Sequence, residues 1–241
     1  MIHLPTFMPA THAPLTNLSA WNFDGVDDYV DIGTGVAGAI NGAGMSFSAW
    51  FKRGASGARH VITDLNVETG KTKFQAEIQA ADTIRVGARS INTDSYQSVT
   101  TTGTWTDTDW HHLFAVVDIA NDTISLWVDG SSAATTGTPS WTNTVFAGTS
   151  GYNDRIGDNS ASSGPFNGKI DMLGYYDAVL GASNATAAYN AGVPVDLRLI
   201  ANSSDLIAFL PFEENTGTTT YDLIGSNDGT LENGTAWTTR T

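Results

Sequence analysis

The chain has 241 residues, no cysteine, and a formal net charge of −14 from 25 acidic and 11 basic residues. This length suits one all-β domain with a sizeable core, and the lack of cysteine excludes disulfide staples, a thiolate nucleophile and a cysteine-ligated zinc ion. The negative charge repels phosphates and anionic lipids, so we expect neither a nucleic acid nor a membrane among the partners.

Residues 1–20 predict an extended N-terminal arm. The segment contains no lysine or arginine and is interrupted by Pro5, Pro9 and Pro14, whereas a signal peptide needs a basic start and an unbroken apolar stretch. We therefore expect no signal peptide here, and no other run is apolar enough to span a membrane. The arm is either a frayed terminus or a strap over a neighbouring subunit, and the second interpretation fits a homo-oligomer.

The next segment, WNFDGVDDYVDIG, predicts two short strands around Trp21–Phe23 and Tyr29–Ile32, joined by an Asp-Gly turn. Further strands are expected where short β-rich runs lie between clusters of Gly, Asn, Asp and Ser. These runs are Met45–Phe51, Lys73–Gln79, Thr83–Arg89, Trp110–Asp118, Thr123–Val128 and Lys169–Tyr176. Short strands with this turn punctuation indicate an antiparallel sandwich of two sheets.

Alternation within these strands separates a core face from a second face with aromatic and planar polar side chains. In Met45–Phe51, for example, Phe47 and Phe51 point to one side and Trp50 to the other. If the strands share one sheet, its second face offers flat rings and hydrogen-bonding groups that suit sugars. The alternative for the tryptophans is burial under loops as a second layer of core. The candidate glycan-binding residues are Trp50, Trp127, Gln75, Glu77, Arg85 and Arg89.

One segment, Ala182–Ala191, has helical character, with Ser183 as its cap and Gly192 as its stop; Pro194 prevents continuation. No tandem repeat or linker divides the chain. We therefore predict one domain over residues 21–241, an all-β jelly-roll sandwich of two antiparallel sheets with this one short helix.

Six segments follow one another in a recognisable order. They are FDGVDDYVDIG (23–33), MSFSAWFKR (45–53), DTDWHHLFAVVD (107–118), ISLWVDG (124–130), RIGDN (155–159) and FNGKIDMLGYYDAVL (166–180). Their order and spacing resemble the laminin-G-like jelly roll of the concanavalin A-like lectin/glucanase superfamily, over roughly residues 20–192.

A segment that such domains commonly carry before the FDG strand has its counterpart here at the C-terminal end, in residues 206–237. The termini of a jelly roll often lie near each other. We therefore expect these residues to complete the sandwich beside Phe23–Gly33, as in a circular permutation.

No pattern predicts catalysis. Glycoside hydrolysis needs an acid and a nucleophile on either side of the sugar bond, but the five glutamates are scattered, and the adjacent Glu213 and Glu214 would point to opposite faces of a strand. His111 and His112 also project oppositely, with no partnering nucleophile pattern. We predict a protein that is not an enzyme.

Calcium is the other chemical use that the sequence offers for its 20 aspartates, because Ca²⁺ takes about six to eight oxygen ligands. The family resemblance implies a structural Ca²⁺ that ties the early strand to a late acidic strand. Here Met172 replaces the second acid of that late strand. The alternative is that Asp27 and Asp28 form only a turn with Gly25. The candidate ligands are Asp24 with Asp171, and further Asp27, Asp222 and Asn227.

The resemblance extends to laminin-G-like domains of exposed phage virion proteins. It implies a non-enzymatic virion structural protein, as a capsid decoration, head-fibre or tail appendage subunit that also binds host-surface glycans. Its expected partners are other virion proteins and further copies of itself, on the virion surface. The alternative is a bacterial secreted or cell-surface module for carbohydrate binding or adhesion.

Overall fold

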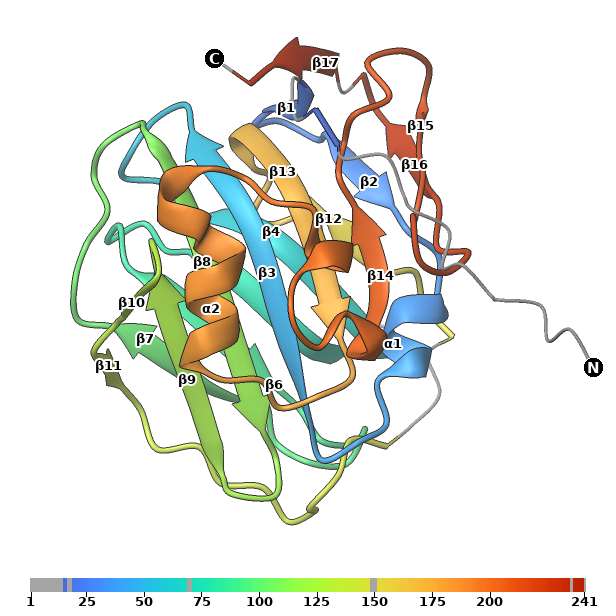
Figure 1. The fold of residues 1–241 in the computed structure, drawn as a ribbon. Coiled ribbons are helices and arrows are strands. Elements are labelled where there is room, and N and C mark those ends of the chain that lie inside the picture. Colours follow the sequence, from blue (N-terminus) through green and yellow to red (C-terminus); the bar gives the residue numbers. More distant parts are fainter. Residues whose placement is uncertain (1–14, 17–18, 69–70, 148–150, 235, 241) are drawn as a thin grey trace, which may run out of the picture.

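Two antiparallel sheets face each other in the computed structural model, which describes residues 15–16, 19–68, 71–147, 151–234 and 236–240 (Figure 1). The sequence-based prediction of an all-β, two-sheet sandwich with one short helix after the main strands is confirmed. The predicted arm lies outside the described residues, apart from residues 15–16 and the first two residues of the first strand.

Sheet A has the strand order β10-β9-β8-β3-β13-β1-β17, and β14 pairs with another part of β13. Its strands are β1 (Ser19–Asp24), β3 (Gly44–Arg53), β8 (Trp110–Asp118), β9 (Thr123–Val128), β10 (Ser131–Ser132), β13 (Asn167–Tyr176), β14 (Leu206–Leu210) and β17 (Ala236–Thr239).

Sheet B has the order β11-β7-β6-β5-β4-β12-β2-β16-β15. Its strands are β2 (Tyr29–Asp31), β4 (His60–Glu68), β5 (Lys71–Ile78), β6 (Ile84–Ala88), β7 (Gln97–Thr101), β11 (Thr135–Thr136), β12 (Arg155–Ile156), β15 (Thr219–Thr220) and β16 (Gly229–Glu232).

The main core lies between the sheets and follows the alternation of the strands. Phe47 of sheet A packs on Phe74 of sheet B, with ring centroids 5.5 Å apart, and on Tyr175 at 5.3 Å. All three are fully buried. Burial of each such side chain contributes about 1.5–3 kcal/mol, so this aromatic cluster holds the two sheets together.

A second apolar core lies on the outer side of sheet A, beneath helix α2 (Ala182–Tyr189) (Figure 1). The helix begins one residue after Gly181, and the side chain of Asn184 accepts a hydrogen bond from the Gly181 N–H at 3.4 Å. The prediction of Ser183 as the cap was therefore wrong. The helix ends where Asn190 adopts a left-handed conformation (φ 47°).

The C-terminal segment contributes strands to both sheets. Strand β14 pairs with β13, β16 with β2, and β17 with β1. Trp237 of β17 lies directly opposite Trp21 of β1, with ring centroids 4.1 Å apart. The end of the chain therefore lies beside its first described strands, as the two ends of the colour range show (Figure 1).

A one-turn helix, α1 (Gly35–Ala39), was not predicted; its sequence, GVAGA, has no amphipathic pattern. Buried side chains hold it in place. Asp154 accepts from the Ala37 N–H at 2.8 Å, and Lys73 Nζ donates to the carbonyls of Ala37 and Ile40 at 2.7 and 2.6 Å. Burial lowers the pKa of Lys73 to about 8 and raises that of Asp154 to about 7.

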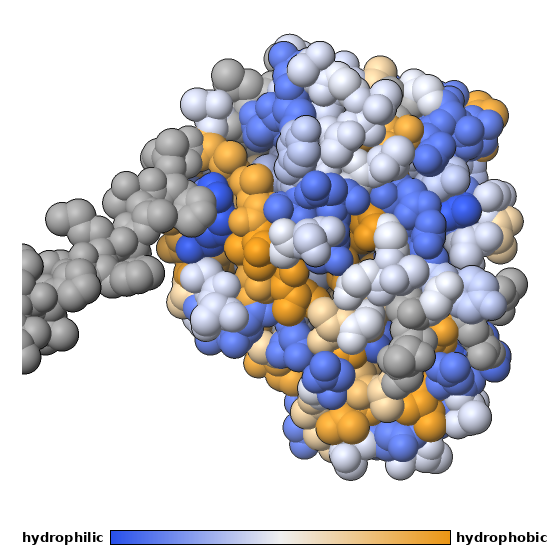
Figure 2. Space-filling view, turned by 90° about the vertical axis from the view of Figure 1, so that its right-hand side faces the viewer, coloured by the Kyte–Doolittle hydropathy of each residue, from blue (hydrophilic) through white to orange (hydrophobic). Residues whose placement is uncertain are grey.

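The side of the molecule that carries α1 and β16 mixes hydrophilic and hydrophobic residues (Figure 2). Within the part of the chain that the structure describes, every helix is too short or too polar to cross a membrane.

Candidate functional site

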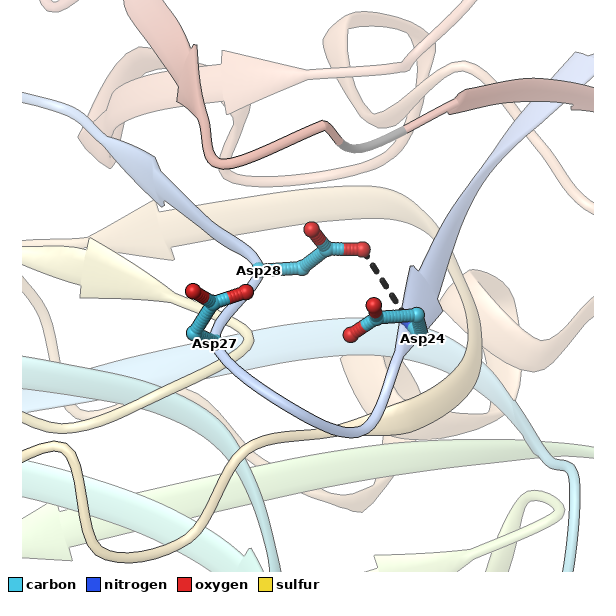
Figure 3. A group of neighbouring side chains, drawn as sticks. All are labelled: Asp24, Asp27 and Asp28. Atoms are coloured by element: carbon cyan, nitrogen blue, oxygen red, sulfur yellow. Dashed lines mark hydrogen bonds between the residues drawn. The ribbon is translucent and has the colours of Figure 1, made fainter.

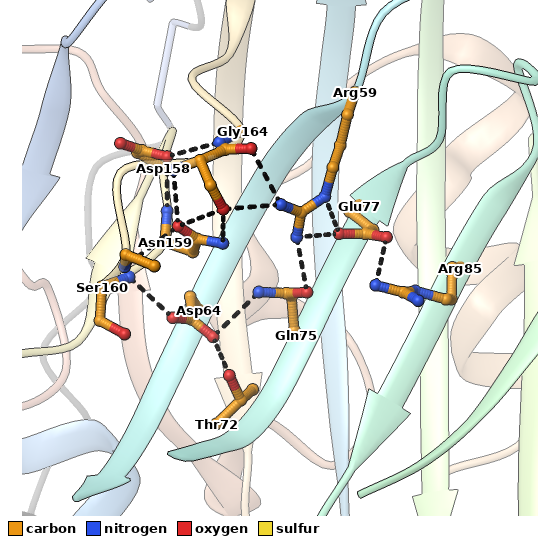
Figure 4. A network of polar contacts seen from close by, with 12 residues as sticks. Arg59, Asp64, Thr72, Gln75, Glu77, Arg85, Asp158, Asn159, Ser160 and Gly164 are labelled. Carbon is orange, nitrogen blue, oxygen red and sulfur yellow. Dashed lines mark hydrogen bonds and ion pairs between the residues drawn. The ribbon is translucent and has the colours of Figure 1, made fainter. Parts of the chain in front are cut away.

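The outer face of sheet B carries a network of charged and polar side chains (Figure 4). At its centre is Glu77 of β5, whose side chain is 1% exposed. One carboxylate oxygen lies 2.5 Å from a guanidinium nitrogen of Arg59, and the other lies 2.7 Å from Arg85 of β6. A buried carboxylate is costly unless paired, so the two arginines are held in fixed positions around it.

A second carboxylate, that of Asp64 on β4, anchors the other half of the network. It accepts hydrogen bonds from Gln75 Nε2 at 3.1 Å, Thr72 Oγ1 at 2.8 Å and the Ser160 N–H at 3.0 Å. Burial raises its pKa, and these donors oppose the rise. Because Ser160 belongs to the loop after β12, Asp64 fastens that loop to the sheet.

Part of this face keeps unused hydrogen-bonding capacity. The side chains of Arg59 and Arg85 are 30% and 31% exposed. The buried Nε of Arg85 and the buried hydroxyl of Tyr96 have no hydrogen-bond partner among the described residues. Tyr96 lies against β6 at Gly87, where a Cβ atom would come within 2.5 Å of its ring. The face therefore presents the planar donors of two partly exposed guanidinium groups, close to the half-buried ring of Tyr96.

The structure divides the six predicted glycan-binding residues between the two sheets. Gln75, Glu77 and Arg85 lie on the outer face of sheet B, and Arg89 follows β6 and donates to the Thr72 carbonyl at 3.3 Å. The two tryptophans belong to strands of sheet A. The premise that all these strands share one sheet was wrong.

The tryptophans of sheet A pack in the second core. Trp50 is 3% exposed and stacks on Tyr189 of α2 at 5.7 Å between ring centroids. The half-buried Trp127 makes an edge-to-face contact with Phe114 at 6.3 Å. This is the arrangement that the alternative interpretation described, with α2 as the covering element for Trp50.

Sequence reasoning missed several residues of this face, among them Arg59, Asp64 and Tyr96. Asp64 lies in β4, where the pairing with β5 shifts register three times. Each shift interrupts the alternation from which the outer face is inferred. Arg59 and Tyr96 lie outside strands, where alternation gives no signal.

Three aspartates meet in the turn between β1 and β2: Asp24, Asp27 and Asp28 (Figure 3). One oxygen from each lies within 4.8 Å of the others. Asp24 also accepts from the Val26 N–H at 2.7 Å, and Asp28 from the Asp24 N–H at 2.9 Å. The second oxygen of Asp28 is buried and has no hydrogen-bond partner among the described residues. Burial, and then the charges of the other two aspartates, raise the pKa of Asp28.

The other predicted metal ligands, Asp171, Asp222 and Asn227, lie elsewhere. The structure therefore corrects the predicted set of ligands, because it does not bring these residues together with Asp24 and Asp27. Asp24 pairs with Asn167, four residues from Asp171 along β13, a separation of about 13 Å at about 3.3 Å per residue. The buried carboxylate of Asp171 instead pairs with Arg240. Asp222 accepts four hydrogen bonds, two of them from Asn227 at 3.1 and 2.9 Å. This carboxylate organises its own loop.

The two adjacent histidines point in opposite directions, and each has a structural partner. His112 is fully buried under α2 and lies 2.9 Å from Ser48 Oγ. Burial lowers its pKa to about 3. His111 lies between Asp129 at 2.7 Å and Asp107 at 2.8 Å. Burial opposes its charge, but these two carboxylates raise its pKa overall.

A family model described as the concanavalin A-like lectin/glucanases superfamily matches residues 24–185. The chain belongs to this family. Among curated protein sequences, no relative matches the chain.

Solved structures share the fold at low sequence identity. A Bacteroides ovatus protein described as carbohydrate-binding aligns with a TM-score of 0.68 and 17% identity, over 93% of this chain and 60% of that protein. A heptameric SAP-like pentraxin from Limulus polyphemus aligns with a TM-score of 0.64 and 12% identity, over 94% and 97% of the two chains. The CBM40 of the Ruminococcus gnavus IT-sialidase aligns at 0.54 and 15%, over 72% and 99%. This chain therefore has the fold of lectin-like carbohydrate-binding modules.

Proposed function

We propose that this protein is a non-enzymatic glycan-binding protein and that it binds sugars on the outer face of sheet B. The observation that carries the proposal is the pairing of one buried carboxylate, Glu77, with two guanidinium groups that are each about one third exposed, Arg59 at 30% and Arg85 at 31%. The fold shared with carbohydrate-binding modules supports the same function.

The chemistry of this face suits a polyhydroxylated ligand. A guanidinium presents several N–H donors in one plane, which can donate to the hydroxyl oxygens of a sugar. Because Glu77 already fixes the arginines, a ligand does not have to order them on binding, which lowers the entropic cost.

The carboxylates of the face support binding over hydrolysis. Glycosidases of the usual kind need one carboxylic acid and one carboxylate free to reach the sugar bond. Here Glu77 is engaged by two arginines, and Asp64 accepts three hydrogen bonds. Neither side chain is available as an acid or a nucleophile.

The setting in which the protein works is a separate part of the proposal. A cysteine-free, strongly acidic chain suits both an exposed virion protein and a bacterial surface or secreted module. The Bacteroides ovatus and Ruminococcus gnavus structures support the bacterial setting through the fold alone. Mass spectrometry of purified phage particles would identify the protein if it is a virion component, and its recovery only from bacterial cells or medium would exclude the virion role.

We also propose that the turn between β1 and β2 binds Ca²⁺ through Asp24, Asp27 and Asp28. The buried, unpartnered oxygen of Asp28 supports a bound cation, because an unpaired buried carboxylate oxygen is destabilising. Added Ca²⁺ would then raise the melting temperature of the wild type and not of Asp28→Asn. An identical melting temperature in Ca²⁺ and in EDTA would contradict this.

A glycan array tests the main proposal. We expect wild-type protein to bind a subset of glycans and Arg85→Ala to bind them at least about tenfold more weakly. Arg198→Ala is the matched control, because this arginine pairs with Asp196 in the segment after α2, at 2.6 Å. Equal loss in both variants, or no binding by wild-type protein, would contradict the proposal.

A further inference from the structure

A surface cavity lies in the C-terminal segment, outside the residues matched by the family model. It has a volume of about 350 Å³, within the range of about 300–1,000 Å³ typical of small-ligand sites. Its lining residues are Glu214, Thr216, Gly217, Thr218, Thr219 and Tyr221.

The cavity is built on a fixed frame. The Leu231 N–H of β16 donates to the Thr218 carbonyl at 2.9 Å, and Trp237 Nε1 of β17 donates to the Gly217 carbonyl at 3.0 Å. Trp237 in turn packs on the fully buried Trp21. The loop that lines the cavity is therefore tied to strands of both sheets.

Glu214, which lines the cavity, has one carboxylate oxygen without a hydrogen-bond partner among the described residues. Glu214 Oε1 accepts from the Tyr221 N–H at 2.7 Å and from Thr220 Oγ1 at 3.3 Å. Glu214 Oε2 is buried and has no hydrogen-bond partner among the described residues. Burial raises the pKa of this carboxyl. If the Glu214 side chain rotates to bring Oε2 to the cavity, a ligand can donate a hydrogen bond to this oxygen and satisfy it.

The rest of the lining defines the class of ligand. Tyr221 is 53% exposed, so its ring is accessible to a ligand in the cavity. The other side chains are neutral threonine hydroxyls. Only one carboxylate lines the cavity, whereas Ca²⁺ takes about six to eight oxygens, most often several of them carboxylate.

We propose that this cavity binds a single sugar ring. One hydroxyl of the ring donates to Glu214 Oε2, and the apolar face of the ring packs against Tyr221. The inference takes its class of ligand from the proposed function but shares no residue with the face of sheet B. The two sites would give one small protein two points of contact with a glycan chain, which increases avidity without any new contact within either site.

Amide NMR with the methyl glycosides of glucose, galactose, mannose and N-acetylglucosamine as probes tests this inference. We expect at least one glycoside to shift the amide signals of Tyr221 and Gly217. Tyr221→Ala should abolish the response, and Glu214→Gln should weaken it about tenfold. Tyr152→Ala is the matched control, because this tyrosine is 44% exposed elsewhere on the surface.

The outcomes separate the two sites. Shifts at Tyr221 without shifts on β5 and β6 would support the cavity and count against the face of sheet B. Shifts on β5 and β6 alone would overturn the cavity and leave the proposed function intact. A response at Tyr221 to CaCl₂ or to free lysine, but to none of the glycosides, would also overturn the sugar assignment.

Discussion

The two outer faces of the sandwich are built by the same strand alternation but end in opposite environments. The outer face of sheet A carries Trp50 and His112, which are 3% and 0% exposed beneath α2. The outer face of sheet B carries Arg59 and Arg85, which are about one third exposed. Alternation shows which side chains leave the main core, and a covering helix decides whether they meet solvent.

The outer faces of the two sheets also differ in how exposed their ion pairs are. On sheet A, Asp171 lies opposite Trp50, and its carboxylate is enclosed together with Arg240. The guanidinium of Arg240 lies 4.7 Å from the centroid of the Trp50 ring and 4.1 Å from that of the Trp110 ring. On sheet B, Glu77 pairs with guanidinium groups that remain accessible. The first arrangement stabilises a packed layer, and the second presents donors to a ligand.

Removal of a large side chain from the covered face should have the largest effect on stability. We expect Trp50→Ala to lower the free energy of unfolding by about 3–5 kcal/mol, because it leaves a cavity beneath α2. Urea denaturation measures this loss. Trp127→Ala, at a half-buried position, should cost clearly less. Equal losses at the two positions would show that α2 does not cover Trp50 more completely than Trp127.

On the polar face, Glu77→Gln should lower stability by about 2 kcal/mol, because two arginines lose their buried counterion but remain partly solvated. It should also weaken glycan binding, since Arg59 and Arg85 lose their fixed orientation. Glu232→Gln, at a half-buried edge position, is the control. If glycan binding is unchanged in Glu77→Gln, the network around Glu77 is not needed for binding.

The buried histidine of the covered face predicts acid sensitivity. His112 has a folded pKa lowered to about 3 by burial, so it stays neutral in the fold while the unfolded chain takes up a proton below about pH 6.5. Its contribution to stability is therefore lost as the pH falls below about 6.5, by at most about 1.4 kcal/mol per pH unit. The slope between pH 6.5 and 5 should flatten in His112→Gln.

His111 should show the opposite sign, since its pKa is raised in the fold. Its contribution is present below the ordinary histidine pKa and is lost as the pH rises through the raised value. NMR titration should find that His111 titrates above the ordinary histidine pKa and that His112 stays uncharged down to pH 5. The reverse order would contradict the environments described for the two rings.

Local patterns predicted the sandwich and many of its strands, but not which outer faces of the sheets are covered by other elements. Phe47 and Phe51 alternate with Trp50, and turn-forming residues separate the runs, so strands and their core face could be inferred. Nothing in the alternation shows that α2, more than 100 residues later, packs over Trp50. Helix α1 depends on Lys73 and Asp154, which lie far from it in the sequence. The local pattern around residues 35–39 therefore cannot predict it.

The same distinction applies to the candidate sites. Asp24 and Asp27 meet because they share one turn, which local sequence can indicate. The pairing of Asp171 with Arg240 joins positions 69 residues apart, and it removes Asp171 from any shared cation site. Arg59 and Tyr96 reach the face of sheet B from loops, so their place depends on tertiary structure alone.

The most direct measurement of the central claim is an amide NMR map of the wild-type protein with a glycan that the array identifies. The account predicts shifts that centre on β5 and β6, around Gln75, Glu77 and Arg85, with α2 and the outer face of sheet A unchanged. Shifts centred on α2 and Trp50 instead, with β5 and β6 unchanged, would contradict it.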